Sequence, residues 1–549
     1  MSEVSGPARA SIHDIEAALD GRDMDRAIAL AQRAYAQGMR HPLVLNLVAY
    51  KLELDDRIDE ALGVLNEALR FAPNDPFVIN SIGVCYSKLA KPENALAAFD
   101  AALAIDPSLA HAHNGRGLAL LSLGDKEAAR LAQLRAAELD PQFPEPLGAL
   151  AALAAEDKIW DEARDYAERA LRLEANQPAA SLAMAGFELN AGDAAAAIGR
   201  IDALIATGRL TRLHLANALN LRGDAKEALG RAPEAMVDYI AANRESRPLH
   251  VAALNAGELG LDMAERLIAY FEAADPADWR PIPDGDDLGR ERGHVFLVGF
   301  ARSGTTLLEQ VLASHADIVA LEEKQTVDPA ILEFVKDNAS LDRLKTLDEA
   351  GAREWRELYW NRVREFGVEP AGKVFVDKLP LHTFYLPVIA KLFPRAKILF
   401  ALRDPRDVVI SCFKHRFRPN PLTVELADLE RAARIYAAAM RLAELYREKL
   451  TLPFHIHQHE HLVEDLDAAS QAICEFIGLP CDANMRNFVE TANKREIRTP
   501  SAGQVRRGLY RDGIAQWRKY GSTIDVIQPI LRPWAEQFGY PAAQGTGSP

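Results

Sequence analysis

The sequence predicts two domains of different fold class: an α-helical repeat solenoid, followed by an α/β P-loop-like domain whose parallel sheet is flanked by helices. Three observations lead to this prediction. Small residues recur every 34 residues in the first half, short apolar runs alternate with longer segments in the second half, and one apolar run ends in a loop of G-x-x-x-x-G spacing. A 34-residue period is typical of helix–turn–helix repeats, and strand–helix alternation is typical of a parallel sheet.

The repeats are marked by two sets of alanines at intervals of 34 residues. The sets are Ala61, Ala95, Ala129, Ala163 and Ala197, and Ala68, Ala102, Ala136 and Ala170. Asp-Pro pairs at 106–107 and 140–141 keep the same spacing and are expected to end one unit and begin the next. The pattern resembles the tetratricopeptide repeat (TPR) family over about residues 39–246. Residues 12–38 are expected to form a further unit or a cap.

A change of composition after the repeats sets the expected domain boundaries. Residues 274–291 are rich in Pro, Asp and Gly, which is typical of a linker. We expect a TPR domain over residues 12–273, an α/β domain over 292–541 and a disordered tail over 542–549. The concave surface of a TPR array binds a protein or peptide segment, and the alternative is a spacer or dimerisation scaffold. The sequence leaves the occupant of the groove and the oligomeric state open.

Charge and composition exclude several classes of function. The formal net charge of −15 disfavours a general nucleic-acid binder, so an anion site must be a local basic pocket. No apolar run approaches the ~20 residues of a membrane helix, and residues 1–10 lack the apolar stretch of a signal peptide. The four cysteines are scattered and lack zinc-ligand spacing. We therefore expect reduced thiols and a cytoplasmic protein.

The most informative segment is a strand–loop–helix pattern near the start of the second domain. Residues 295–298 are expected to form a buried strand, residues 299–304 a tight loop, and Thr305 the start of a helix. Such a loop points backbone N–H groups and the positive end of a helix dipole at one place, which suits a phosphate. A nucleotide triphosphatase has Lys where this chain has Thr305, and Arg302 stands inside the loop instead. We therefore expect a phosphate ligand other than the β/γ end of Mg-ATP.

Polar residues also follow other expected strands. Lys378 follows the apolar run 374–376, and Arg403 follows the run 397–402, with Ser411 in the helix after it. Ligands of open parallel sheets bind at the carboxyl ends of the strands. Arg403 and Ser411 are therefore placed to hold a second anion near the first.

These motifs, in this order, resemble the sulfotransferase family over about residues 292–540, and look closest to the branch of tyrosylprotein sulfotransferases and TPR-fused bacterial enzymes. The resemblance implies that the donor is 3′-phosphoadenosine 5′-phosphosulfate (PAPS), with no metal. It implies that the R-S-G-T-T loop holds the 5′-phosphosulfate and that the R-D-P-R-D…S segment holds the 3′-phosphate. The donor-binding residues are then Arg302, Ser303, Gly304, Thr305, Thr306, Arg403, Ser411 and Lys519.

The same resemblance assigns catalytic roles. Sulfuryl transfer builds negative charge on the oxygen that leaves with the phosphate, so positioning and electrostatic stabilisation should dominate. Arg302 and Lys378 would neutralise this charge, and Ser501 would donate a further hydrogen bond to the leaving side. Glu323, 21 residues after Arg302, is the expected general base for the acceptor hydroxyl, and the adjacent Glu322 is the alternative.

Several of these residues also have a purely structural interpretation. Lys378 is adjacent to Asp377 and Arg403 is adjacent to Asp404, so each basic residue can form an ion pair with its neighbour. The two glutamates at 322–323 can be a solvated acidic start of a helix. The sequence alone leaves these alternatives open.

Other features depart from the family pattern or stay open. Four histidines alternate along one expected strand: His455, His457, His459 and His461. Alternation places side chains on one face, as in a metal site, but we favour no metal role, because His459 replaces the aromatic residue of the family's Y-E-D-L-like segment. Gln325 stands where animal tyrosylprotein enzymes carry an Arg that contacts the peptide. Trp517 and Tyr520 either stack on adenine or belong to the core.

The sequence leads to ranked hypotheses about function. The first is a PAPS-dependent sulfotransferase whose TPR module recruits a protein or peptide acceptor, with tyrosine as one candidate hydroxyl. The second keeps PAPS but uses a carbohydrate, lipid or small-molecule hydroxyl, and leaves the TPR array for assembly. A kinase or NTPase is disfavoured because Lys is absent after Gly304. A catalytically inactive nucleotide-binding scaffold is the hypothesis of a different class.

Overall fold

The computed structural model describes residues 11–21, 23–254, 257–282, 288–495, 505–506, 508–509 and 513–541. The chain divides into two compact units, residues 1–230 (unit 1) and residues 231–549 (unit 2). The segment 542–549, expected to be a disordered tail, lies outside the described residues.

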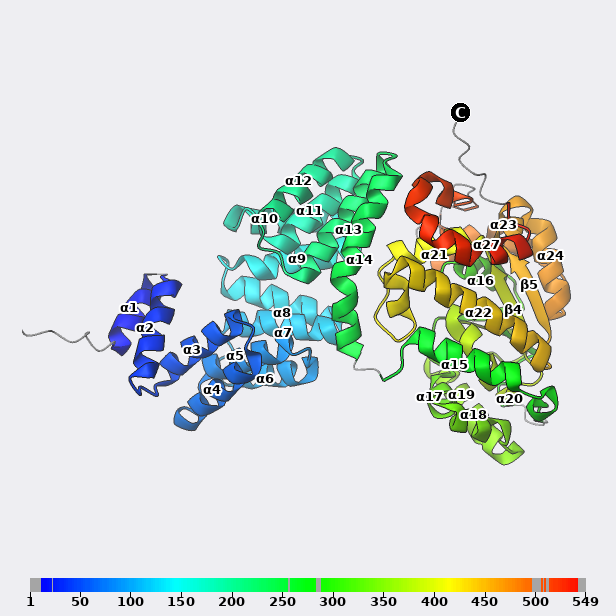
Figure 1. Cartoon of the computed structure of the whole chain (residues 1–549), viewed down its shortest axis with the longest axis horizontal. Helices are drawn as coiled ribbons and strands as arrows, with labels where there is room; N and C mark the ends of the chain where they lie inside the picture. The colour runs from blue at the N-terminus through cyan, green and yellow to red at the C-terminus, as the bar shows by residue number, and fades with distance from the viewer. Residues whose placement is uncertain are drawn as a thin grey trace, which may run out of the picture. The chain divides into compact units, whose positions relative to one another are not determined.

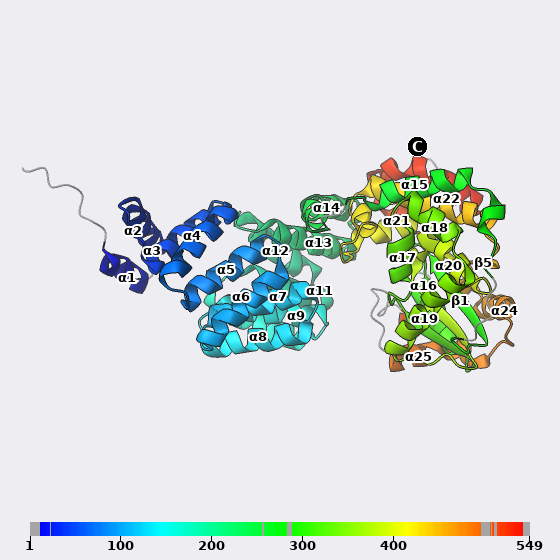
Figure 2. The ribbon, with the colours of Figure 1, turned by 90° about the horizontal axis from the view of Figure 1, so that it is seen from below.

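Unit 1 is a solenoid in which each helix packs against its neighbours along the chain (Figures 1 and 2). Successive helix pairs begin at residues 42, 76, 110, 144 and 178, so their starts repeat every 34 residues as the sequence predicts. The helices of unit 1 are α1 (Ile12–Asp20), α2 (Met24–Ala36), α3 (Pro42–Leu54), α4 (Ile58–Phe71), α5 (Pro76–Lys88), α6 (Pro92–Ile105), α7 (Ala110–Leu123), α8 (Lys126–Leu139), α9 (Pro144–Glu156), α10 (Trp160–Leu173), α11 (Pro178–Asn190), α12 (Ala194–Ala206) and α13 (Arg212–Ala228).

The recurring alanines of unit 1 are buried where paired helices meet. Every alanine of the two repeating sets has 0% exposure. A methyl side chain lets two helix backbones approach closely, and a larger residue in such a packed contact forces them apart. The alanine period is therefore a packing requirement, and it confirms the predicted helical solenoid.

Unit 2 contains a five-stranded parallel sheet with the order β2-β3-β1-β4-β5. The strands are β1 (Gly293–Gly299), β2 (Ile318–Glu322), β3 (Val374–Lys378), β4 (Lys397–Leu402) and β5 (Phe454–Gln458). The sequence pattern predicts no strand for the β2 segment. After β1 the chain winds toward one edge of the sheet, and from β3 it returns across β1 toward the other edge. The carboxyl ends of β1 and β4 therefore flank the crevice where ligands of such sheets bind.

Helices cover both faces of this sheet, as predicted. Val295 and Leu297 of β1 point into one core, and the alternate residues Phe296 and Val298 point into the other. α24 packs in the first core and α22 in the second, on either side of β4 and β5 (Figure 1). The helices and 3₁₀ segments that follow β1 are α16 (Thr305–Ala313), α17 (Asp328–Phe334), α18 (Asn338–Lys345), α19 (Glu349–Glu365), η2 (Pro380–Tyr385), α20 (Leu386–Leu392), α21 (Pro405–Lys414), η3 (Thr423–Ala427), α22 (Leu429–Lys449), α23 (His459–Glu464), α24 (Leu466–Ile477), η4 (Ala483–Asn487), α25 (Phe488–Lys494), η5 (Gln516–Ile527) and α27 (Gln528–Gln537). Among the described residues, no helix has both the length and the apolar character needed to span a membrane.

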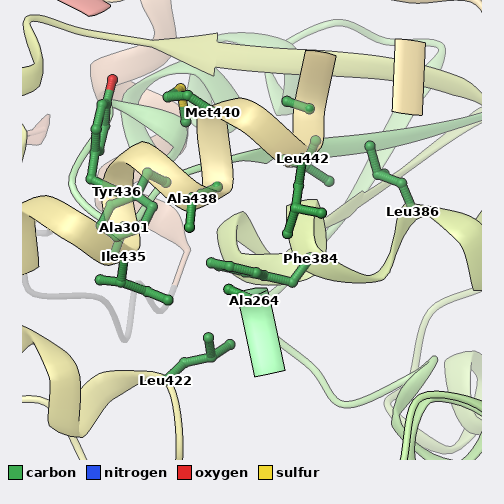
Figure 3. Packing of buried hydrophobic residues seen from close by; sticks show 14 of the residues in the cluster. Ala264, Ala301, Phe384, Leu386, Leu422, Ile435, Tyr436, Ala438, Met440 and Leu442 are labelled. Atoms are coloured by element: carbon green, nitrogen blue, oxygen red, sulfur yellow. The ribbon is translucent and has the colours of Figure 1, made fainter. Parts of the chain in front are cut away.

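The structure places the division between units earlier than the composition indicates. α14 (Ala232–Leu254) and α15 (Gly260–Ala273), which the sequence analysis grouped with the repeats, belong to unit 2. Figure 3 shows Ala264 of α15 in the same apolar cluster as Phe384 and the α22 residue Ile435. A Cβ at Gly260 would lie 2.7 Å from the backbone of Leu422, so the backbone of α15 packs directly against the backbone at Leu422.

The described part of the expected linker is packed as well. It contains η1 (Pro276–Trp279), and Trp279 is only 2% exposed within the core of unit 2. Lys391 Nζ donates hydrogen bonds to the carbonyl oxygens of Asp278 and Arg280 at 3.3 and 3.0 Å. This part of the chain is therefore packed onto the rest of unit 2.

Candidate functional site

The predicted site residues lie where the parallel strands end. Arg302 is in the loop after β1, Glu322 ends β2, Lys378 ends β3 and Arg403 follows β4. The register pairs Glu322 with Lys378 directly across β2 and β3, so their side chains point to the same face of the sheet. Residues far apart in the sequence thus meet at one edge.

The glycine loop turns tightly into α16. Arg302 and Gly304 both have positive φ, at 66° and 92°. No side chain caps the N-terminus of α16, so its first N–H groups and its dipole are suited to an anion. A Cβ at Gly304 would lie 2.4 Å from Nδ1 of His459, so backbone conformation and lack of space both require glycine here.

Arg302, Ser411 and Arg403 form one contiguous cluster beside the loop. Arg302 Nε donates a hydrogen bond to Ser411 Oγ at 3.0 Å, and Arg403 Nη1 donates to the carbonyl oxygen of Arg302 at 3.2 Å. Arg403 Nη2 also donates to the carbonyl oxygen of Gly513 at 2.5 Å. The Arg403 Nε atom is buried and has no hydrogen-bond partner among the described residues. Buried N–H groups are rarely left unpaired, so this atom is a candidate donor to a bound anion.

Arg403 is not the ion-pair partner of Asp404, so that alternative interpretation is wrong. The Asp404 carboxylate pairs with both Nε and Nη2 of Arg406, at 2.9 and 2.7 Å. The Arg406 guanidinium lies 4.0 Å from the centre of the Trp517 ring, and both residues are buried. Trp517 and Tyr520 are 7% and 1% exposed within the core of unit 2, which leaves their rings as packing groups.

Lys378 is completely buried and surrounded by carboxylates. Its Nζ lies 2.8 Å from Glu323 Oε1, 3.5 Å from Glu309 Oε2 and 3.6 Å from Glu322 Oε1. Burial by itself would lower the pKa of Lys378, but the negative charges of Glu309, Glu323 and Glu322 together outweigh burial and raise that pKa. Lys378 is therefore a protonated ammonium at neutral pH.

The ion pair between Lys378 and Asp377, considered as an alternative, is also wrong. Asp377 points to the opposite face of the sheet, as adjacent strand residues must. Its Oδ2 accepts hydrogen bonds from Tyr359 Oη at 2.8 Å and from Thr326 Oγ1 at 2.7 Å. The ion pairs of Lys378 are therefore with the carboxylates on its own face of the sheet.

Glu323 lies closer to Lys378 than Glu322 does, and its side chain is the more exposed of the two. Glu323 follows β2 in a left-handed conformation, with φ at 45°, and its N–H donates to the carbonyl oxygen of Lys378 at 2.8 Å. Its side chain is 38% exposed, whereas that of Glu322 is 12% exposed. Of the two, Glu323 has both the shorter contact with Lys378 and the more accessible carboxylate. The pair ends a strand, so the interpretation as an acidic helix start is wrong.

The sequence analysis missed two charged residues of this cluster, Glu309 and Arg495. Glu309 lies in α16 with 0% exposure, and its Oε1 is 3.3 Å from Arg495 Nη1. Burial raises the pKa of Glu309 to about 6, although the nearby Lys378 opposes this rise. The signal was a single charged residue in the stretch of residues 303–314, directly after the loop. The contact with Arg495 spans 186 residues of sequence and leaves no local pattern.

Of two further predicted residues, the structure describes Lys519 but not Ser501. Ser501 lies outside the described residues. Lys519 is an exposed residue of η5, and its Nζ donates to Gln516 Oε1 at 2.6 Å. Ser303 is buried, and its Oγ donates to the carbonyl oxygen of Phe300 at 2.7 Å, which stabilises the loop.

The expected single strand of four histidines is wrong. His455 and His457 lie on β5, but the strand ends at Gln458, and His459 and His461 belong to α23. Among the described residues, no group of three or more His, Cys, Asp or Glu side chains could hold a metal ion. Burial lowers the pKa of His459 to about 3, so its ring is neutral beside the loop.

Comparison with known proteins gives two family matches. Residues 294–483 match the model of the sulfotransferase family, and residues 78–109 and 110–143 match that of the tetratricopeptide repeat. Protein-tyrosine sulfotransferase 1 of Danio rerio is 32% identical over 266 residues, which cover 45% of this chain and 72% of that protein.

Two further relatives match the chain over similar lengths. Protein-tyrosine sulfotransferase A of Caenorhabditis elegans is 24% identical over 273 residues, which cover 46% of this chain and 69% of that protein. An uncharacterized protein of Aquifex aeolicus is 28% identical over 255 residues, which cover 44% of this chain. The match spans about a third of the length of the Aquifex protein, 33%.

Proposed function

Because this chain belongs to the sulfotransferase family, we propose that it transfers a sulfuryl group from PAPS to an acceptor hydroxyl. The observation that carries the proposal is the 2.8 Å contact between Lys378 Nζ and Glu323 Oε1 at the strand edge beside the glycine loop. The two groups supply the charges that the reaction needs: a cation for the leaving oxygen and a base for the acceptor proton.

The residues around the loop fit an adenosine 3′,5′-bisphosphate group. The uncapped N-terminus of α16 and Arg302 are suited to a 5′-phosphosulfate. The unpaired Nε of Arg403 and the Ser411 hydroxyl are suited to a 3′-phosphate. We propose that the segment from Arg302 to Thr306 holds the first group and that Arg403 and Ser411 hold the second, without a metal ion.

In the proposed mechanism, Glu323 removes the proton from the acceptor hydroxyl while that oxygen attacks sulfur. The new bond joins the acceptor oxygen to sulfur, and the bond from sulfur to the 5′-phosphate oxygen breaks. Arg302 and Lys378 neutralise the negative charge left on that phosphate oxygen. The products are a sulfate ester and adenosine 3′,5′-bisphosphate. Ser501 keeps its proposed role as a hydrogen-bond donor to the leaving side.

We propose that the acceptor is a tyrosine hydroxyl of a protein or peptide, recruited by the TPR unit. Two observations support this choice: relatives that match the α/β domain are named protein-tyrosine sulfotransferases, and solenoid repeats offer extended binding surfaces. Gln325 is exposed, and its carbonyl oxygen accepts a hydrogen bond from Arg362 Nε at 2.9 Å. The Arg362 guanidinium therefore places a positive charge next to Gln325, whose own side chain is uncharged.

Incubation with ³⁵S-labelled PAPS and separate acceptors tests the function. The acceptors are a tyrosine peptide with acidic neighbours, the same peptide with phenylalanine, an oligosaccharide and p-nitrophenol. Label on the tyrosine peptide alone supports the proposal. Label on the oligosaccharide or on p-nitrophenol alone would replace tyrosine by the second class of hydroxyl. Absence of both label transfer and bisphosphate binding would overturn the sulfotransferase proposal.

We expect Arg403→Ala to weaken binding of adenosine 3′,5′-bisphosphate by about 10- to 100-fold, because a charge-assisted hydrogen bond contributes ~1.5–3 kcal/mol. Thermal unfolding with and without the bisphosphate measures this: a ligand at ~100 times its Kd adds ~2.7 kcal/mol of stability. Arg434→Ala is the matched control, because Arg434 forms an exposed helix pair with Glu430 at 2.6 Å. Equal stabilisation of all three proteins by Mg-ATP and by the bisphosphate would contradict the assignment of Arg403.

We expect Gly304→Ala to weaken bisphosphate binding by about 10-fold or more, because the added Cβ meets His459 at 2.4 Å and the left-handed backbone costs ~1–2 kcal/mol. Isothermal titration with the bisphosphate measures the effect. Gly372→Ala is the control: Gly372 has φ at 72°, but open space surrounds its Cβ position. This control should lose some stability and keep its affinity. Unchanged affinity in Gly304→Ala would show that the loop does not hold the ligand.

A further inference from the structure

A second, fully buried carboxylate contacts Lys378 in addition to Glu323. Glu309 has 0% exposure, and its two carboxylate oxygens lie 3.5 Å from Lys378 Nζ and 3.3 Å from Arg495 Nη1. Neither oxygen has a hydrogen-bond partner of normal geometry among the described residues. Keeping a buried carboxylate ionised in this way costs free energy of folding, and a neutral residue of similar size would cost less. Packing alone therefore does not account for an acid at this position.

Charged groups of both signs face Glu309. The groups that face it are Lys378 from β3, Arg495 after α25, and Glu322 and Glu323 from the end of β2. Among the described residues, two cations and two further carboxylates thus face Glu309. The negative charge of Glu309 itself lies beside the edge at which a bisphosphate would bind, so it opposes the positive charge offered by the loop.

Glu309 also connects three parts of unit 2. It belongs to α16, the helix that begins at the glycine loop, and it contacts Lys378 at the end of β3. Arg495, its other partner, donates from Nη2 to the carbonyl oxygen of Ala320 in β2 at 3.0 Å. The position of Lys378 Nζ is therefore restrained by carboxylates of different elements, among them Glu309 of α16 and Glu323 after β2.

We propose that Glu309 is a positioning residue that anchors Lys378 for transfer and limits how tightly the site holds the bisphosphate product. The inference rests on the proposed function. Glu309 restrains the ammonium from moving wholly onto the phosphate. Its negative charge also reduces the attraction of the site for the anionic product, which favours release. Transfer speed and product affinity should then change in opposite directions when this charge is removed.

Glu309→Gln keeps the shape of the side chain and removes its charge. We expect this variant to bind adenosine 3′,5′-bisphosphate about 3- to 10-fold more tightly and to transfer sulfuryl groups about 10-fold more slowly. Glu309→Asp retains the charge but shortens the side chain, so it should keep an affinity close to that of the wild type while transferring more slowly. Glu357→Gln, an exposed residue of α19 paired with Arg353 at 3.0 Å, is the matched control and should change neither quantity.

The pH dependence of the affinity ratio gives a second readout. Burial raises the pKa of Glu309 to about 6, with Lys378 and Arg495 opposing and Glu322 and Glu323 adding to the rise. Below that pH the wild-type carboxyl is protonated and resembles Gln, so the ratio of wild-type to Glu309→Gln dissociation constants should approach one. Above it, the ratio should increase to its full value. Titration of the ligand itself cancels in this ratio.

Thermal unfolding, calorimetric titration with the bisphosphate and ³⁵S transfer on the full-length variants decide the matter. Tighter binding together with slower transfer in Glu309→Gln supports the proposal. Weaker binding and slower transfer together would indicate a structural role and overturn it, as would no change in either. If Glu309→Gln fails to fold, an affinity of Glu309→Asp far from that of the wild type overturns it. Failure of the wild type itself to bind the bisphosphate would instead overturn the proposed function.

Discussion

Lys378→Met should lower sulfuryl transfer by about 10²- to 10³-fold, because the loss of one preorganised charge at a developing anion typically has this effect. The reason is the position of the ammonium: it is buried, protonated and 2.8 Å from the expected base. Methionine keeps much of the length of the side chain and removes the charge. Single-turnover transfer from labelled PAPS measures the chemical step without interference from product release.

The same substitution should also destabilise unit 2. Removal of Lys378 leaves the buried Glu309 without one of its two described cationic contacts, and breaking a buried pair in this way costs ~3–5 kcal/mol. The pKa of Glu309, already raised to about 6, should rise further in this variant. The folded state then binds a proton that the unfolded state releases, so the variant should lose stability as pH rises from 5 to 8. Chemical denaturation at both pH values measures the difference.

A compensated variant separates the two effects. Lys378→Met combined with Glu309→Gln removes both buried charges, so it should recover most of the lost stability. Transfer should stay low, because no cation is restored at the leaving oxygen. Recovery of transfer in the double variant would contradict a catalytic role of Lys378 and would assign the defect of the single variant to misfolding.

The parts of the site that could be predicted from the sequence are those encoded by local pattern. The loop around Arg302 and Gly304 has a fixed spacing after an apolar run, and Arg403 follows another such run. Both patterns specify a strand end, and parallel strands bring their carboxyl ends to one edge. This rule predicts that residues far apart in the sequence meet at that edge. The hydrogen bond from Arg403 to the carbonyl oxygen of Arg302, 101 positions earlier, is such a contact.

The parts that could not be predicted depend on tertiary packing. Glu309 and Arg495 carry no motif, and only the fold makes them neighbours of Lys378. The compact units divide after residue 230, whereas the sequence pattern groups α14 and α15 with the repeats, because these helices have the helical character of the repeats that precede them. Periodicity reports which face of a helix is buried, but not the partner that covers it. For α15 the covering partner is the segment at Leu422, which lies against Gly260 although more than 160 residues of chain separate the two.

Glu323→Gln should lower transfer by about 10²- to 10⁴-fold, the usual contribution of a positioned general base. The amide keeps the shape of the side chain and a contact to Lys378, but it cannot accept the acceptor proton. Binding of adenosine 3′,5′-bisphosphate should not weaken, because the proposed contacts to the donor come from the loop and from Arg403.

Glu322→Gln is the matched control, because Glu322 is the adjacent carboxylate with the longer contact to Lys378, 3.6 Å against 2.8 Å. It should reduce transfer far less than Glu323→Gln, since its side chain is less accessible to an acceptor. The reverse order of effects would assign the base to Glu322. Along β2, Glu322 alternates with Leu321, so the Glu322 side chain is directed toward Lys378 and the interior face. The left-handed conformation of Glu323, in contrast, turns the chain away from the strand. A single residue with φ at 45° would thus decide which of two adjacent carboxylates performs proton transfer.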